Sequence, residues 1–246
     1  MKQNKVVIHE IQNDLPESEV IGENFKVLID GINDNLPNFN GSLWAIVGKG
    51  GSGKSCLFLS MFKNKEFLRG KFDEIHYIVS SGSFSSVKKH PFKDHDKNHF
   101  DLTAELLFEI YDEAIERKEQ CLENGDPIEH TAIIIDDCGT LFKNNDIQYA
   151  LRKIMNVARH ANLYIILIVQ TYKMIPLEIR RILTHITVFR PSNEEWELII
   201  KELLVIKPHT CHALYKYVFN RMYNHLTIDM KKNELRKNFK LLDITE

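Results

Sequence analysis

The residue pattern with the clearest chemical meaning is an eight-residue run that contains four glycines, Gly48-Lys49-Gly50-Gly51-Ser52-Gly53-Lys54-Ser55. It matches G-x-x-x-x-G-K-[ST], in which glycines allow successive backbone N–H groups to turn inward around a phosphate. A helix that begins near Gly53 would direct the positive end of its dipole at the same anion. Lys54 is expected to reach the outer phosphate oxygens, and the Ser55 hydroxyl to bind Mg²⁺. The sequence therefore predicts a site for a nucleoside triphosphate and its magnesium ion.

Two carboxylates follow an apolar run further along the chain. Asp136 and Asp137 come directly after residues 131–135, and parallel α/β sheets bind ligands at the carboxyl ends of their strands. We expect Asp136 to hold Mg²⁺ opposite Ser55, and Asp137 to polarise the water that attacks the terminal phosphate. Many hydrolysing enzymes with this loop have the longer glutamate at the second position. The alternative is that the pair caps a helix or a turn.

A polar residue also ends the apolar run Leu163–Val169. Gln170 stands there, and we expect it to contact the terminal phosphate or to orient the attacking water. An arginine beside the nucleotide of a neighbouring subunit would stabilise the charge of the transition state. Arg159 is the first candidate for this trans role and Arg180 is the second. The alternative for each arginine is a surface ion pair.

The elements that must position these residues are short runs of isoleucine and valine without polar alternation, as is typical of strands buried on both faces. They interleave with helical segments, which predicts an α/β fold of three layers with a mostly parallel central sheet and extra edge strands. The expected core strands are 42–47, 75–79, 132–135, 163–169 and 185–189, with 226–228 as a last edge strand. The expected helices are 53–63, 103–122, 146–160, 193–205 and 209–222. A nucleotide-binding domain over 41–230 is expected, between a strand-rich extension at 1–40 and a basic tail at 231–246.

Charge is distributed unevenly along the chain, although the 246 residues have a formal net charge of only −2. Hydrophobic residues make up 43%, which excludes a disordered tail protein, and no run approaches the roughly 18 apolar residues of a membrane span. Residues 105–129 carry nine acidic and two basic side chains. By contrast, 88–97 contains four lysines and 231–240 contains five basic residues. We expect one of these basic segments to face DNA phosphates; the alternative for each is a solvated surface.

Histidines gather in the polar segment 83–101 without a full set of metal ligands. His90, His95 and His99 lie there with Asp94 and Asp96. We expect a solvated or DNA-facing loop rather than a metal site.

With these features together, the sequence resembles the viral genome-packaging ATPases of the FtsK/HerA superfamily, in the poxvirus-type branch shared by large eukaryotic DNA viruses and virophages. The resemblance is carried by GKGGSGKS at 48–55, AIIIDD at 132–137, ARHANLYIILIVQ at 158–170 and IRRILTHITVFRP at 179–191. The last two separate this branch from other proteins with the same phosphate loop. The match covers about residues 42–191, with a looser match through 224–229, and residues 1–40 resemble nothing that we can assign.

The resemblance implies a P-loop NTPase fold of the additional-strand type and an ATP-hydrolysing, Mg²⁺-dependent ring motor that translocates double-stranded DNA into a preformed capsid. Lys54 and Ser55 would be its Walker A residues, Asp136 and Asp137 its Walker B pair, and Gln170 its sensor. The implied partners are double-stranded DNA, further copies of the chain in a pentameric or hexameric ring, and capsid vertex or portal proteins. The implied location is the virion or the host-cell cytoplasm, without secretion.

Two other functions remain open at this point. The first is a P-loop small-molecule kinase, although the second carboxylate and the glutamine both suit the activation of water, and segment 83–101 lacks the arginines of a kinase lid. The second is a nucleotide-gated assembly protein that does not hydrolyse ATP, in which Asp137 would be too short to act as base.

Overall fold

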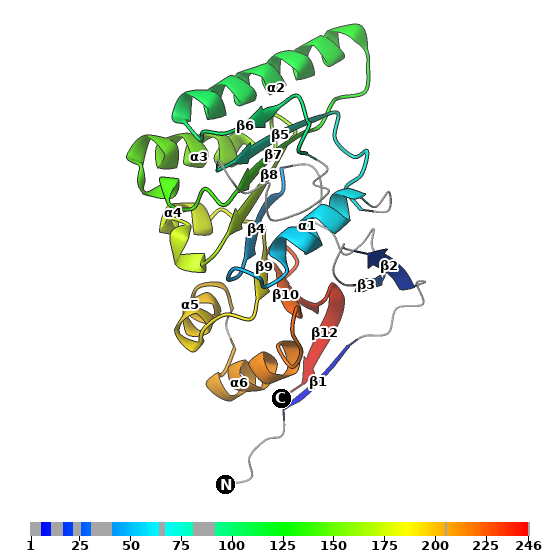
Figure 1. Cartoon of the computed structure of the whole chain (residues 1–246), viewed down its shortest axis with the longest axis vertical. Helices are drawn as coiled ribbons and strands as arrows, with labels where there is room; N and C mark the ends of the chain where they lie inside the picture. The colour runs from blue at the N-terminus through cyan, green and yellow to red at the C-terminus, as the bar shows by residue number, and fades with distance from the viewer. Residues whose placement is uncertain are drawn as a thin grey trace.

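A ten-stranded sheet runs through the molecule (Figure 1). The structure is a computed structural model, and it describes residues 6–10, 17–21, 26–30, 41–63, 67–80, 92–204 and 206–245. In sheet order the strands are β1 (Val7–Glu10), β12 (Lys240–Thr245), β11 (Glu234–Lys237), β10 (His225–Asp229), β9 (His185–Phe189), β4 (Leu43–Val47), β8 (Leu163–Val169), β7 (Thr131–Asp136), β5 (Glu74–Val79) and β6 (Asn98–His99). A separate antiparallel pair is formed by β2 (Glu17–Ile21) and β3 (Lys26–Asp30).

The six strands from β9 to β6 are parallel, and the four strands from β10 to β1 are antiparallel to their neighbours. The strand β8 lies between β4, which precedes the glycine-rich loop, and β7, which ends in the first of the two carboxylates. This inserted strand confirms the additional-strand type of the fold. Because all six strands are parallel, their carboxyl ends meet at one edge of the sheet, where such folds bind ligands.

Helices cover both faces of this sheet. They are α1 (Lys54–Lys63), α2 (Ala104–Asn124), α3 (Asn145–Val157), α4 (Leu177–Arg180), α5 (Asn193–Leu203) and α6 (Pro208–Val218), with short 3₁₀ turns at Leu141–Lys143 and Tyr172–Met174. The strand β4 sends Leu43, Ala45 and Val47 into the core beneath α3 and α4, and Trp44 and Ile46 into the core beneath α1. The expected three layers are therefore present.

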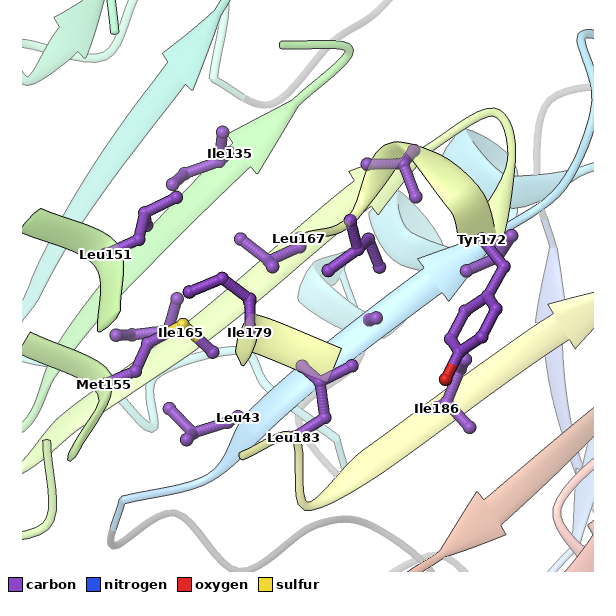
Figure 2. Packing of buried hydrophobic residues seen from close by; sticks show 14 of the residues in the cluster. Leu43, Ile135, Leu151, Met155, Ile165, Leu167, Tyr172, Ile179, Leu183 and Ile186 are labelled. Atoms are coloured by element: carbon purple, nitrogen blue, oxygen red, sulfur yellow. The ribbon is translucent and has the colours of Figure 1, made fainter. Parts of the chain in front are cut away.

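The core on the α3 side packs aliphatic and aromatic side chains of successive elements against one another. Figure 2 shows Leu151 and Met155 of α3 beside Ile135 of β7 and Ile165 of β8. All four side chains are almost inaccessible to solvent, so each contributes about 1.5–3 kcal/mol of burial free energy. This packing holds β7 and β8 in place at the edge where the candidate residues project.

The carboxyl-terminal part of the chain differs from the sequence prediction. The strand expected at 226–228 is not an edge strand, because β10 lies between β9 and β11. Residues 231–245 form no free tail, since β11 and β12 extend the main sheet and β12 pairs with β1. The basic residues of this segment are typical of a solvated tail, and for that reason the sequence does not predict these strands. Arg236 is nevertheless buried, because Glu234 pairs with it and compensates its charge without solvent. The expected loop at 83–101 also contains the two-residue strand β6. Within the described ranges, no helix has the length and apolar character needed to cross a membrane.

Candidate active site

The glycine-rich loop joins β4 to α1 at the carboxyl edge of the sheet. The Gly48 N–H donates to the carbonyl oxygen of Val169 at 3.1 Å, and the Ser52 N–H donates to that of Lys49 at 3.1 Å. Gly51 and Gly53 have φ angles of 74° and 100°, which residues with a Cβ rarely adopt. The loop therefore curls tightly and leads into α1 at Lys54, so that the amino end of this helix faces the loop, as phosphate binding requires.

Lys54 lies close to both carboxylates at the end of β7. Its Nζ donates to the Lys49 carbonyl oxygen at 3.1 Å, which holds the side chain over the loop. Burial lowers the pKa of Lys54, while the nearby charges of Asp136 and Asp137 raise it. The ammonium of Lys54 therefore lies within electrostatic range of both carboxylates.

Asp136 is the last residue of β7 and is 8% exposed. Its Oδ2 accepts a hydrogen bond of 2.7 Å from the hydroxyl of Tyr77, a residue of the adjacent strand β5. Burial raises the pKa of Asp136 to about 6, and both the Tyr77 hydrogen bond and the charge of Lys54 act in the opposite direction. Burial likewise raises the pKa of Tyr77 far above its usual value, so the tyrosine remains a hydrogen-bond donor.

Asp137 begins the tight turn after β7, with a φ of 55°. Its N–H donates to the carbonyl oxygen of Ile168 at 3.1 Å. Its Oδ1 accepts a hydrogen bond of 3.0 Å from Nε2 of Gln170, and both side chains are exposed. The inserted strand β8 thus brings the candidate sensor into contact with the candidate base.

The donor set at this edge fits Mg²⁺. The Ser55 hydroxyl at the start of α1 and the Asp136 carboxylate at the end of β7 offer hard oxygen ligands, which Mg²⁺ prefers. Asp136 is also oriented by a partner of its own, as metal-binding carboxylates usually are. Neither residue type favours a soft metal.

The two candidate arginines lie apart from this group. Arg159 is exposed in the turn from α3 into β8, at the amino edge of the sheet. Its backbone packs against Gly41, since a Cβ added at Gly41 would lie 2.6 Å from the Cβ of Arg159. Arg180 forms an ion pair of 3.1 Å with Glu202 and lies over the ring of Tyr172, 4.8 Å from its centroid. Arg180 is therefore held within its own subunit, whereas Arg159 points to solvent.

Sequence reasoning missed Tyr77. The signal would have been a phenol near the carboxyl end of the strand Glu74–Val79, close before a polar loop. That signal acquires meaning only once β5 is known to pair with β7, because a buried phenol is otherwise a common core residue.

A second cluster combines two glutamates and one histidine from β5 and α2. One ligand atom from each of Glu74, His76 and Glu113 falls within 4.8 Å of the others. The ammonium of Lys97 contacts both glutamates, and Arg117 contacts them as well. Because these two cations already balance the two carboxylates, we interpret the cluster as an ion-pair network that joins α2 to β5.

The predicted DNA-facing segments lie only partly within the described residues. Of 88–97, residues 88–91 with Lys88, Lys89 and His90 lie outside them. In the segment 231–240, Lys237 and Lys240 lie 3.4 and 3.9 Å from the carboxylate of Glu10. The lysines at 231 and 232 are exposed in the turn between β10 and β11.

A family model described as the Poxvirus A32 protein matches residues 37–226, more than half of the chain. No curated protein sequence matches the chain. The family match confirms the resemblance to the poxvirus-type branch that the sequence indicated.

Solved structures of viral ATPases share the fold. The genome-packaging NTPase B204 of Sulfolobus turreted icosahedral virus 2, in complex with AMPPCP, is 19% identical, with a TM-score of 0.54 over 82% of this chain and 97% of that one. The DNA-packaging ATPase B204 of Sulfolobus turreted icosahedral virus is 18% identical, with a TM-score of 0.53 over 81% and 98% of the two chains. A third similar structure, ATPases 2 and 3 of EssC from Geobacillus thermodenitrificans, is 12% identical, with a TM-score of 0.57 over 96% of this chain and 45% of that one. At such identities the likeness shows the fold alone.

Proposed function

Because the chain belongs to the poxvirus A32 family, we propose that it is an ATP-hydrolysing ring motor that translocates double-stranded DNA into a preformed capsid. The observation that carries the proposal is the meeting of four side chains at one sheet edge: Lys54 lies beside Asp136 and Asp137, and Gln170 bonds Asp137 at 3.0 Å. The B204 proteins that share this fold are described as a genome-packaging NTPase and a DNA-packaging ATPase, which supports the same activity for this chain.

We assign the roles by the position of each group. The loop N–H groups and Lys54 bind the triphosphate and neutralise charge that develops during transfer. Ser55 and Asp136 would hold Mg²⁺, which supplies further charge stabilisation at the phosphate oxygens. Asp137 accepts the proton of the attacking water, and Gln170 orients Asp137 or that water through its amide.

The kinase alternative is less well supported. A kinase must exclude water from its transferred phosphate, whereas Asp137 and Gln170 are both exposed and hydrogen-bonded to each other beside the loop. A pair of this kind suits the activation of water. The rate of ATP turnover by an Asp137 variant distinguishes the motor from the nucleotide-gated assembly protein, which would not need Asp137 as a base.

Assembly into a ring would complete the site. Arg159 is exposed at the amino edge of the sheet, so it is suited to reach the nucleotide of a neighbouring copy rather than that of its own subunit. Arg180 would first have to leave Glu202, to which it is paired at 3.1 Å. We therefore propose Arg159 as the trans residue of a pentameric or hexameric ring, with capsid vertex or portal proteins as further partners in the virion or the infected cytoplasm.

DNA contact is proposed for the turn between β10 and β11. Lys231 and Lys232 are exposed there, and lysines that contact phosphates bind DNA of any sequence, as a motor requires. The basic residues Arg236, Lys237 and Lys240 of the same segment have acidic neighbours within the subunit. Residues 88–91 are a second candidate on sequence grounds alone.

The test is phosphate release from Mg²⁺·ATP with and without double-stranded DNA, with the mass of the oligomer measured in the same sample. We expect DNA to stimulate hydrolysis by an assembled ring. Replacing Lys231 and Lys232 with glutamate should reduce the stimulation and preserve basal hydrolysis. The matched control is the same charge reversal at Lys63 and Lys71, which are exposed elsewhere in the chain. DNA-independent phosphate transfer to a nucleoside would overturn the motor proposal.

A further inference from the structure

The hydroxyl of Tyr77 contacts the carboxylate that we assign to magnesium. Tyr77 lies on β5, one strand away from Asp136 on β7, and its O–H donates to Oδ2 at 2.7 Å. The two side chains are 1% and 8% exposed. Because both groups are buried, this hydrogen bond to a carboxylate is less screened by water than one at the protein surface.

Neighbouring rings fix the direction of this hydroxyl. The ring of Phe92 is stacked on Tyr77, with centroids 4.9 Å apart and planes inclined by 15°. The ring of Phe58 is stacked at 6.3 Å and 17°, and Phe58 belongs to α1, the helix that begins with Lys54 and Ser55. The tyrosine therefore has little freedom to rotate away from Asp136, and its position is tied to the phosphate-binding helix.

From this geometry we infer that Tyr77 is a positioning residue that holds the Asp136 carboxylate in the orientation required to bind Mg²⁺ at the nucleotide site. The inference rests on the proposed function for the identity of the cation. An unbonded aspartate would distribute its carboxylate over several rotamers, and fixing one of them before the cation arrives removes an entropic cost of binding. Partners of this kind typically change metal affinity by about 10- to 100-fold when they are removed.

The test is Tyr77→Phe, which keeps the stacked ring and removes only the hydroxyl. Binding of a fluorescent, non-hydrolysable ATP analogue is titrated in EDTA and then over a range of Mg²⁺ concentrations. We expect the affinity in EDTA to stay within about twofold of wild type, and the Mg²⁺ concentration for half-maximal enhancement to rise about tenfold. The matched control is Tyr164→Phe, which removes another fully buried hydroxyl from the same core cluster. Tyr164 lies near the amino end of β8, away from the carboxyl edge of the sheet, so this variant should leave the Mg²⁺ titration unchanged.

Three results would overturn the inference: an unchanged Mg²⁺ titration, equal losses of affinity with and without Mg²⁺, or the same shift in Tyr164→Phe. If Tyr77→Phe does not fold, Phe92→Leu removes the stacked ring and keeps the hydroxyl. It should raise the Mg²⁺ concentration for half-maximal enhancement by less than the roughly tenfold rise expected for Tyr77→Phe. No change in that concentration also counts against the inference. Failure of the proposed function is distinguishable, because it appears as wild-type protein that binds Mg²⁺ and nucleotide but does not release phosphate.

Discussion

Replacing Asp137 with asparagine should separate its role as base from its role as a hydrogen-bond partner. Asparagine has nearly the same shape, and its Oδ1 can still accept the 3.0 Å hydrogen bond from Gln170. The neutral amide, however, cannot take a proton from the attacking water. The variant should therefore bind ATP normally and lose hydrolysis.

The size of the loss follows from the contacts. General-base catalysis contributes about 10²- to 10⁴-fold, so single-turnover hydrolysis by Asp137→Asn should fall by that amount. Gln170→Ala removes one hydrogen bond between exposed groups, worth about 0.5–1.5 kcal/mol or roughly 2- to 12-fold in rate. If Gln170 acts through Asp137, the double variant should be no slower than Asp137→Asn alone.

The assay is phosphate release in a single turnover at saturating Mg²⁺·ATP, with the dissociation constant of a non-hydrolysable analogue measured in parallel. A matched control is Asp146→Asn, which makes the same chemical change at an exposed residue at the start of α3. Slow and equal turnover in wild type and Asp137→Asn would refute the reasoning and favour the nucleotide-gated assembly protein.

The packing around Gly48, the burial of His225 and the positions of the two candidate arginines can be tested in the same way. Gly48→Ala places a Cβ 2.8 Å from that of Phe189, so it should lower the free energy of unfolding by about 1–3 kcal/mol in urea titrations; unchanged stability would contradict the tight packing. Burial lowers the pKa of His225 to about 4, so between about pH 6.5 and 4 the imidazole binds a proton in the unfolded chain but not in the native state. The free energy of unfolding should therefore fall by about 3 kcal/mol as the pH drops from about 6.5 to 4. His225→Phe should flatten that part of the stability profile, and an unchanged slope would count against the assignment. Arg159→Ala should reduce hydrolysis by assembled rings about 10³-fold and leave nucleotide binding intact, whereas Arg180→Ala should chiefly lower stability, because Arg180 is paired inside its own subunit; the reverse outcome would exchange the two roles.

The sequence alone identified the candidate site residues, apart from Tyr77, and much of the secondary structure. The phosphate loop is contiguous, so its curl and the helix after it depend on residues close to each other in the chain. The strands 163–169 and 185–189 have the bounds that the sequence predicts. The run 163–169 has no polar alternation, which is distinctive of a strand with two buried faces. By contrast, 185–189 carries His185 and Thr187 among apolar residues, although all five side chains are buried. The approximate positions of α1, α2, α3, α5 and α6 followed from helical spacing in the same way.

Only the tertiary structure decided which of these elements lie side by side. Insertion of β8 between β4 and β7 sets Gln170 against Asp137, 33 positions earlier in the chain. Pairing of β5 with β7 brings Tyr77 to Asp136 across 59 positions. Pairing at the other end of the sheet turns the expected basic tail into β11 and β12, where the buried Arg236 pairs with Glu234. Strand order is set by the summed packing of the whole core, and local periodicity reports only that a strand is buried, not which strand it pairs with.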